Sequence, residues 1–183
     1  MNSPRSALSC LVCLTLAVMV TAFAAERGGF FRAPPQGPLV LGPGALEVVD
    51  GDTFLYEHRE FRLMGVDTPE RSAPWFDGNQ EPWASQASEL SQRMLERAQE
   101  VRVLSRGRRD RYGRELVHVL VDGRPLAAIL AKAGLAYPTV QHYGDGGFPE
   151  IAEAILKQAR PPEFQHPAVW RAEHRQPWDD DAR

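Results

Sequence analysis

Apolar residues in the first half of the chain form short runs that alternate with turn residues. Three such runs, at 45–50, 53–57 and 60–66, are rich in Val, Leu and Phe, and Asp, Gly and other polar residues separate them. This pattern is typical of short β-strands. The sequence therefore predicts three strands, followed after Pro69 by a loop over 71–82 that is rich in Pro and Gly.

The second half of the chain contains both helical spacing and strand-like alternation of apolar residues. Residues 83–99 place Ala, Leu and Met at helical spacing, and 125–132 and 149–158 are shorter helical segments. Residues 101–104 and 115–122 alternate as strands do. This mixture predicts an α+β domain, but periodicity alone does not specify how its strands are arranged.

The N-terminus has the pattern of a targeting segment. Arg5 precedes an almost continuous apolar run at 7–20, and Ala22-Phe23-Ala24 supplies the small residues of a cleavage site. We expect residues 1–24 to be a signal peptide that is removed, which makes the protein secreted or periplasmic. A retained membrane anchor is the alternative, because a run of about 18 residues can just span a bilayer.

Composition sets the remaining boundaries. Residues 25–44 are rich in Pro and Gly and predict a linker, residues 45–170 a compact domain, and the polar residues 171–183 a C-terminal tail. Both cysteines, Cys10 and Cys13, lie in the predicted signal peptide, so the domain is expected to contain no disulfide. Its stability must then come from its core.

Charge is unevenly distributed. The whole chain has 21 basic and 24 acidic side chains, and removal of residues 1–24, which hold Arg5 and no acid, changes the net charge from −3 to −4. Residues 93–114 nevertheless hold eight Arg and three acids. A basic patch on an acidic protein suits transient binding of a polyanion, although a solvated face with local ion pairs is the simpler alternative.

Three polar motifs stand near the ends of predicted strands. They are Asp50-Gly51-Asp52-Thr53, then Phe61-Arg62-Leu63-Met64-Gly65-Val66-Asp67-Thr68-Pro69-Glu70, then Asp110-Arg111-Tyr112-Gly113-Arg114. Carboxylates at strand ends can project from a sheet edge and hold a hard cation such as Ca²⁺. Arg62 lies between two apolar residues, so on a strand it should face away from the core.

In this order and approximate spacing, the motifs resemble those of the staphylococcal nuclease (thermonuclease) family. The resemblance covers about residues 45–170 and includes Gly134-Leu135-Ala136 after a predicted helix. It implies an OB-fold, which is a five-stranded Greek-key β-barrel, here with about three packed helices.

The resemblance also implies a calcium site. Asp52 and Asp67 would bind Ca²⁺ together with the backbone carbonyl of Thr68. Asp50 would reach the cation through water or through another ligand. For the isolated Asp50-Gly51-Asp52 segment, a tight turn whose carboxylates cap backbone N–H groups is the alternative.

The same family positions imply the catalytic groups. Glu70 would act as general base or would only orient the attacking water, and the sequence leaves this choice open. Arg62 and Arg114 would stabilise the charge that develops on the phosphate. Arg111 and Tyr112 would contact a terminal phosphate, although Tyr112 could instead pack on the barrel.

The chain departs from the family pattern after Gly134-Leu135-Ala136. Pro138 interrupts the segment in which family members carry aromatic residues that seat a base, so Tyr137 and Tyr143 are both candidates for stacking. Ala127 stands where many members have Asn, so a contact that anchors a loop is expected to be missing.

Together these features predict a secreted, monomeric, Ca²⁺-dependent endonuclease with no stable protein partner. It would hydrolyse DNA and RNA with low sequence specificity. One alternative is a catalytically idle OB-fold module that binds nucleic acid. Another is a phosphoesterase for small nucleotides, which the basic patch at 93–114 disfavours.

Overall fold

The computed structural model describes residues 37–176. The predicted signal peptide at 1–24 lies outside these residues, as does most of the predicted linker. Within the described range, none of the helices is both long enough and apolar enough to cross a membrane.

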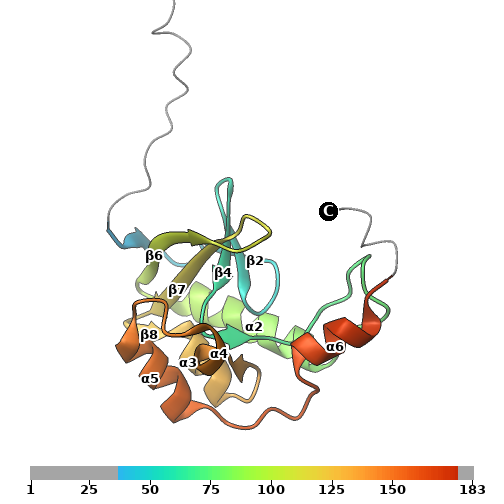
Figure 1. Cartoon of the computed structure of the whole chain (residues 1–183). Coiled ribbons are helices and arrows are strands. Elements are labelled where there is room, and N and C mark those ends of the chain that lie inside the picture. The colour runs from blue at the N-terminus through green and yellow to red at the C-terminus, as the bar shows by residue number, and fades with distance from the viewer. Residues whose placement is uncertain (1–36, 177–183) are drawn as a thin grey trace, which may run out of the picture. The chain divides into compact units, whose positions relative to one another are not determined.

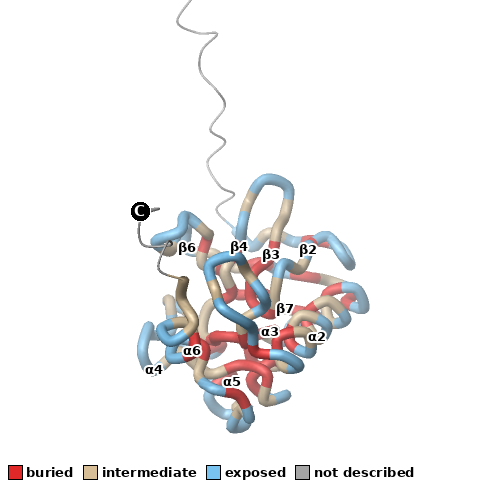
Figure 2. Tube along the Cα trace, turned by 90° about the vertical axis from the view of Figure 1, so that its right-hand side faces the viewer, coloured by how far each residue is buried: buried red, intermediate tan, exposed pale blue. Residues whose placement is uncertain are grey.

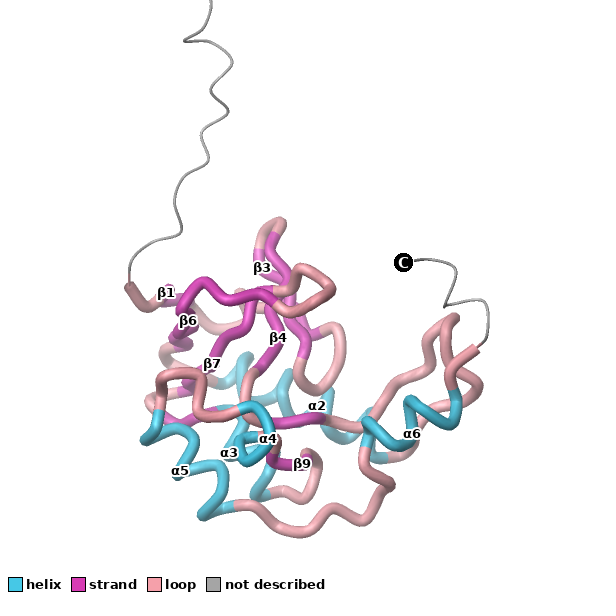
Figure 3. The backbone as a smooth tube through the Cα atoms, in the orientation of Figure 1, coloured by secondary structure: helices cyan, strands magenta, loops and turns pink. Residues whose placement is uncertain are grey.

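One curled sheet of seven short strands is the scaffold of the domain (Figures 1 and 3). Its order is β1-β6-β7-β4-β3-β2, with β8 paired to β7, and all pairings are antiparallel except that of β4 with β7. Strands β5 and β9 form a separate two-stranded ribbon. The strands are β1 (Leu39–Leu41), β2 (Glu47–Val48), β3 (Thr53–Tyr56), β4 (Arg59–Leu63), β5 (Val66–Asp67), β6 (Val101–Arg109), β7 (Glu115–Val121), β8 (Arg124–Pro125) and β9 (Tyr137–Pro138).

The concave face of this sheet forms the core. Phe54, Phe61, Leu63, Val117 and Val119 are fully or almost fully buried there. Because side chains alternate along a strand, the residues between them face the other way. This alternation puts Arg62 on the side opposite its two buried neighbours, as predicted from the sequence.

Helices pack on the open side of the sheet and close the core (Figure 2, where buried segments are red). Helix α2 buries Ala84, Ala87, Ser91 and Leu95, whose spacing of three to four residues defines one helical face. The helices within residues 37–176 are α2 (Trp83–Arg97), α3 (Leu126–Lys132), α4 (Val140–Tyr143), α5 (Pro149–Gln158) and α6 (Pro167–His174).

The predicted α+β class and OB-fold are confirmed. Two boundaries differ from the prediction. Strand β1 lies within the predicted linker, because Leu39, Val40 and Leu41 pair with distant residues of β6. The predicted boundary at Trp170 falls inside α6, which continues to His174. The described residues form five helices, where the resemblance implied about three. They also form seven strands in the main sheet and a two-stranded ribbon, where the resemblance implied five strands.

Candidate active site

A tight turn between β2 and β3 presents Asp52. The Asp50 carboxylate accepts a hydrogen bond of 3.0 Å from the Asp52 backbone N–H, and the Asp52 carbonyl accepts one of 2.8 Å from the N–H of Leu63 on β4. Asp52 is 5% exposed. The turn that the sequence offered as the alternative to a metal site is therefore present, and it also fixes the position of the Asp52 carboxylate.

Gly51 lets this turn approach helix α2. A β-carbon at Gly51 would lie 2.9 Å from the β-carbons of Ala87 and Thr68, which is closer than packed carbon atoms approach. The Ser91 hydroxyl donates a 2.8 Å hydrogen bond to the Gly51 carbonyl from the same helix. Helix α2 thus holds the turn from behind.

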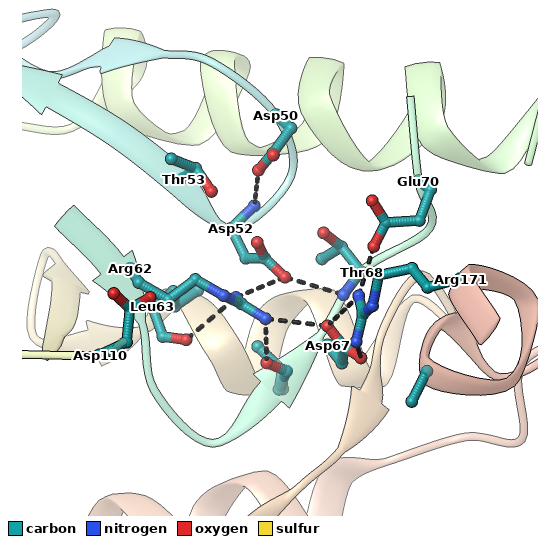
Figure 4. Close-up of polar contacts among 12 residues, drawn as sticks. Asp50, Asp52, Thr53, Arg62, Leu63, Asp67, Thr68, Glu70, Asp110 and Arg171 are labelled. Atoms are coloured by element: carbon teal, nitrogen blue, oxygen red, sulfur yellow. Dashed lines mark hydrogen bonds and ion pairs between the residues drawn. The ribbon is translucent and has the colours of Figure 1, made fainter. Parts of the chain in front are cut away.

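Arg62 on β4 joins the two predicted metal ligands (Figure 4). Its Nη1 lies 2.5 Å from Asp52 Oδ2, and its Nη2 lies 2.8 Å from Asp67 Oδ1. The same two nitrogens donate to the carbonyls of Leu63 and Val66. A single guanidinium therefore fixes both carboxylates and the start of β5.

The segment after β5 carries the remaining acid. The Thr68 backbone N–H donates a 2.8 Å hydrogen bond to Asp52 Oδ2, which ties β5 to the β2–β3 turn. Gln80 is 5% exposed, and it exchanges hydrogen bonds with the backbone of Glu70, through its side-chain oxygen and through its own N–H. Glu70 is thereby held beside Asp67, as its spacing of three residues predicted.

A further arginine, which sequence reasoning missed, reaches the same corner from α6. Arg171 Nη2 lies 2.8 Å from Asp67 Oδ2, and Arg171 Nη1 donates to Asp67 Oδ1 at 3.2 Å and to Glu70 Oε1. Figure 4 shows Arg171 and Arg62 approaching Asp67 from different elements. The position lies in the predicted tail, and no local motif in the sequence marks it.

Burial and like charges perturb the acids of this corner. Burial raises the pKa of Asp52 well above its ordinary value; Arg62 opposes this shift, whereas Asp50 and Asp67 reinforce it. Burial likewise raises the pKa of Glu70, and Arg171 opposes it. Four carboxylates here share two guanidinium groups, so the corner favours additional positive charge.

Arg114 directly precedes β7, in the turn that joins β6 to β7. Its Nε donates to Asp110 Oδ2 at 2.8 Å, and its Nη1 donates to the Thr53 hydroxyl at 3.2 Å. Because Thr53 follows Asp52 directly, Arg114 is brought to the edge of the acidic corner. Asp110 closes the hairpin turn by accepting from the Arg114 backbone N–H as well.

Arg111 and Tyr112, the two predicted phosphate contacts, lie in the turn between β6 and β7. Tyr112 is 63% exposed, so it does not pack on the barrel. The Arg111 guanidinium lies 4.8 Å from the Tyr112 ring centre and donates to its hydroxyl, and Arg114 lies 5.5 Å from the same ring centre. The Tyr112 backbone N–H donates to Asp110, but within residues 37–176 neither Arg111 nor Tyr112 has a hydrogen bond or ion pair with Asp52, Asp67 or Glu70.

The two tyrosines proposed for base stacking differ. Tyr137 is part of β9, its hydroxyl donates to the Phe164 carbonyl at 2.7 Å, and its ring contacts Phe164 and His166. Tyr143 on α4 is 74% exposed. Only Tyr143 of this pair keeps its ring open to solvent.

Comparison with known proteins decides the family. The family described as "Staphylococcal nuclease homologue" matches residues 60–160, which is more than half of the chain. The chain belongs to this staphylococcal nuclease family. The matched range contains Arg62, Asp67, Glu70 and Arg114, whereas Asp52 and Arg171 lie outside it.

Two bacterial relatives from Bacillus subtilis (strain 168) resemble part of the chain. The protein named "Endonuclease YncB" is 34% identical over 93 residues, which is 48% of this chain and 43% of that protein. "SPbeta prophage-derived endonuclease YokF" is 33% identical over 93 residues, or 48% of this chain and 31% of that protein. The alignment thus spans less than half the length of each relative.

The acidic corner of this staphylococcal nuclease homologue offers the type of donor atom that a hard divalent cation binds. Asp52, Asp67 and Glu70 offer carboxylate oxygens, which are the ligands that Ca²⁺ prefers, and their charge exceeds that of the neighbouring guanidinium groups. Among residues 37–176 no group of three or more His, Cys, Asp or Glu side chains is already arranged around a common point. Arg62 and Arg171 instead take up the carboxylate oxygens.

Proposed function

We propose that the chain is a secreted, Ca²⁺-dependent endonuclease that hydrolyses phosphodiester bonds of DNA and RNA with low sequence specificity. The convergence of Asp52, Asp67 and Glu70 with Arg62 and Arg114 at one corner of the sheet carries this proposal. Membership of the staphylococcal nuclease family supports it. Secretion rests on the targeting pattern of residues 1–24.

The acids have separate tasks in this proposal. Asp52, Asp67 and the Thr68 carbonyl would hold Ca²⁺, with Asp50 supporting Asp52 through its backbone. A bound cation would supply a Lewis acid that polarises the phosphate. Glu70 would orient the attacking water or accept its proton, and the 5′-oxygen would leave to give a 3′-phosphate end.

The arginines differ in the donors that they can offer to a phosphate. A guanidinium has five N–H groups. In Arg62, Nη1 and Nη2 each contact two oxygen atoms of other residues within 37–176. Arg114 uses only its Nε and one contact of Nη1. Arg114 is therefore the better placed group to bind phosphate oxygens during attack, with Arg111 and Tyr112 extending the contact.

Cleavage of long single-stranded DNA and RNA tests the proposal directly. The purified chain is incubated with each polymer in Ca²⁺ and in EDTA, beside a dinucleotide. We expect both polymers to be cut in Ca²⁺ only, and faster than the dinucleotide because the polymers also reach the basic patch at 93–114. Binding without cleavage in Ca²⁺, Mg²⁺ and Mn²⁺ would overturn the enzyme proposal and favour an idle OB-fold module.

A further inference from the structure

Helix α6 is anchored at the active-site edge from several sides. Trp170 is 5% exposed and packs on Phe76 of the 71–82 loop, with ring centres 5.3 Å apart. The Asp77 N–H donates to the His174 carbonyl at 2.8 Å, and the Gln176 N–H donates to the Trp75 carbonyl at 3.0 Å. The helix is therefore part of the folded domain.

This anchoring holds Arg171 against the acids. Arg171 directly follows the buried Trp170. The packing of Trp170 therefore positions the Arg171 guanidinium beside Asp67 and Glu70. Its fork contacts both oxygens of Asp67 and one oxygen of Glu70. Bidentate pairs of this kind combine charge and geometry and are among the stronger polar contacts.

The same oxygens are those that the proposed cation needs. Asp67 is a proposed ligand, and Glu70 is proposed to hold the water beside it. A guanidinium bound to these oxygens occupies lone pairs that a divalent cation would use, and the two positive charges repel each other. Arg62 is also bonded to Asp67, but through Oδ1, whereas Arg171 covers both oxygens.

We propose that Arg171 is a built-in competitor of the cation: it neutralises Asp67 and Glu70 in the cation-free protein and must release them when a divalent cation binds. The identity of the cation rests on the proposed function; the competition rests on the contacts of Arg171. The competition by Arg171 therefore raises the free Ca²⁺ concentration at which the site is occupied.

The side chain moves in this exchange and the helix stays. Arg171 is 35% exposed, whereas Asp67 is 7% exposed, so the guanidinium has a path to solvent. Trp170 and the backbone bonds to the 71–82 loop keep α6 in place when the side chain rotates. Loss of Arg171 is therefore expected to leave the fold intact.

The test is the affinity for Ca²⁺, measured by isothermal titration calorimetry on the full chain and without any substrate. Arg171→Gln removes the competing guanidinium, and Arg171→Lys keeps the charge but loses the bidentate contact. Arg124→Gln, at an exposed position, is the control for loss of one positive charge. We expect Arg171→Gln to bind Ca²⁺ at least about tenfold more tightly than the parent chain, because charge-assisted hydrogen bonds no longer compete. Arg171→Lys should fall between them, and Arg124→Gln should match the parent.

Thermal unfolding gives a second readout. In EDTA, Arg171→Gln should unfold at a lower temperature than the parent, because its acids are uncompensated, and Ca²⁺ should raise its midpoint by more than it raises that of the parent. Unchanged or weaker Ca²⁺ binding in Arg171→Gln, or no binding in this variant at millimolar Ca²⁺, would overturn the proposal. Ca²⁺ binding without cleavage of nucleic acid would refute the proposed nuclease but leave the competitor standing.

Discussion

His118 on β7 gives a prediction about stability and pH that is independent of the active site. The ring is 2% exposed, it meets Phe148 edge-on with centres 5.1 Å apart, and neither ring nitrogen makes a well-formed hydrogen bond within residues 37–176. Burial lowers the pKa of His118 to about 4, and the nearby backbone of Asp145 opposes this shift with a smaller effect. The imidazole is therefore neutral in the folded chain.

The sign of the effect follows from proton binding. Below the ordinary histidine pKa of 6.5 the unfolded chain binds a proton that the folded chain does not, so stability falls as the pH drops from about 6.5 towards 4. The full difference between the two pKa values corresponds to about 3 kcal/mol, of which about 2 kcal/mol is lost between pH 7 and pH 5. Above pH 7 the contribution is constant.

The assay is urea unfolding of the parent chain and of His118→Leu at pH 7 and pH 5. Carboxylates titrate in both proteins, so the quantity of interest is the stability of the parent minus that of the variant. We expect this difference to fall by about 2 kcal/mol on going to pH 5, and His58→Leu at an exposed position is the matched control for loss of a histidine. A pH-independent difference for His118→Leu would refute the reasoning that the ring is neutral because it is buried.

Two further substitutions test the packing and the chemistry of the candidate site. Gly51→Ala should destabilise the chain by about 1–3 kcal/mol in urea unfolding, because the added β-carbon would lie 2.9 Å from that of Ala87. Gly42→Ala is the control and should be nearly neutral, because no atom lies within 4 Å of its added β-carbon. Equal destabilisation by the two substitutions would contradict the packing argument. Arg114→Lys should lower kcat for DNA cleavage by roughly 10²-fold or more, on the scale of a lost oxyanion donor, while Ca²⁺ affinity stays unchanged; an unchanged kcat would exclude Arg114 from the reaction.

Local patterns were sufficient for much of the core and for part of the site. The alternation around Phe61 and Leu63 placed Arg62 on the opposite face, and the apolar spacing of residues 83–99 located α2 to within two residues of its C-terminal end. Both features depend on near neighbours in the chain. The motif spacing likewise anticipated that Glu70 would lie beside Asp67.

Long-range contacts could not be predicted in the same way. Strand β1 lies in a segment rich in Pro and Gly, and it forms because Leu39–Leu41 pair with β6, some sixty residues away. The outer half of β6, from Arg106 to Arg109, is exposed and charged, so it lacks the alternation that would reveal a strand. Arg171 reaches Asp67 across a separation of 104 residues, and its short polar helix carries no motif that points to the acids.

The corner formed by Asp52, Asp67 and Glu70 is the proposed nuclease active site. This assignment is tested most directly by the rate of single-stranded DNA cleavage at saturating Ca²⁺ for the parent chain, for Glu70→Gln and for Glu153→Gln on the exposed face of α5. The account predicts a loss of roughly 10²-fold or more in Glu70→Gln, on the scale of general acid–base catalysis, with Glu153→Gln cutting at the parental rate. Parental cleavage by Glu70→Gln, at parental Ca²⁺ affinity, would contradict the assignment of this site.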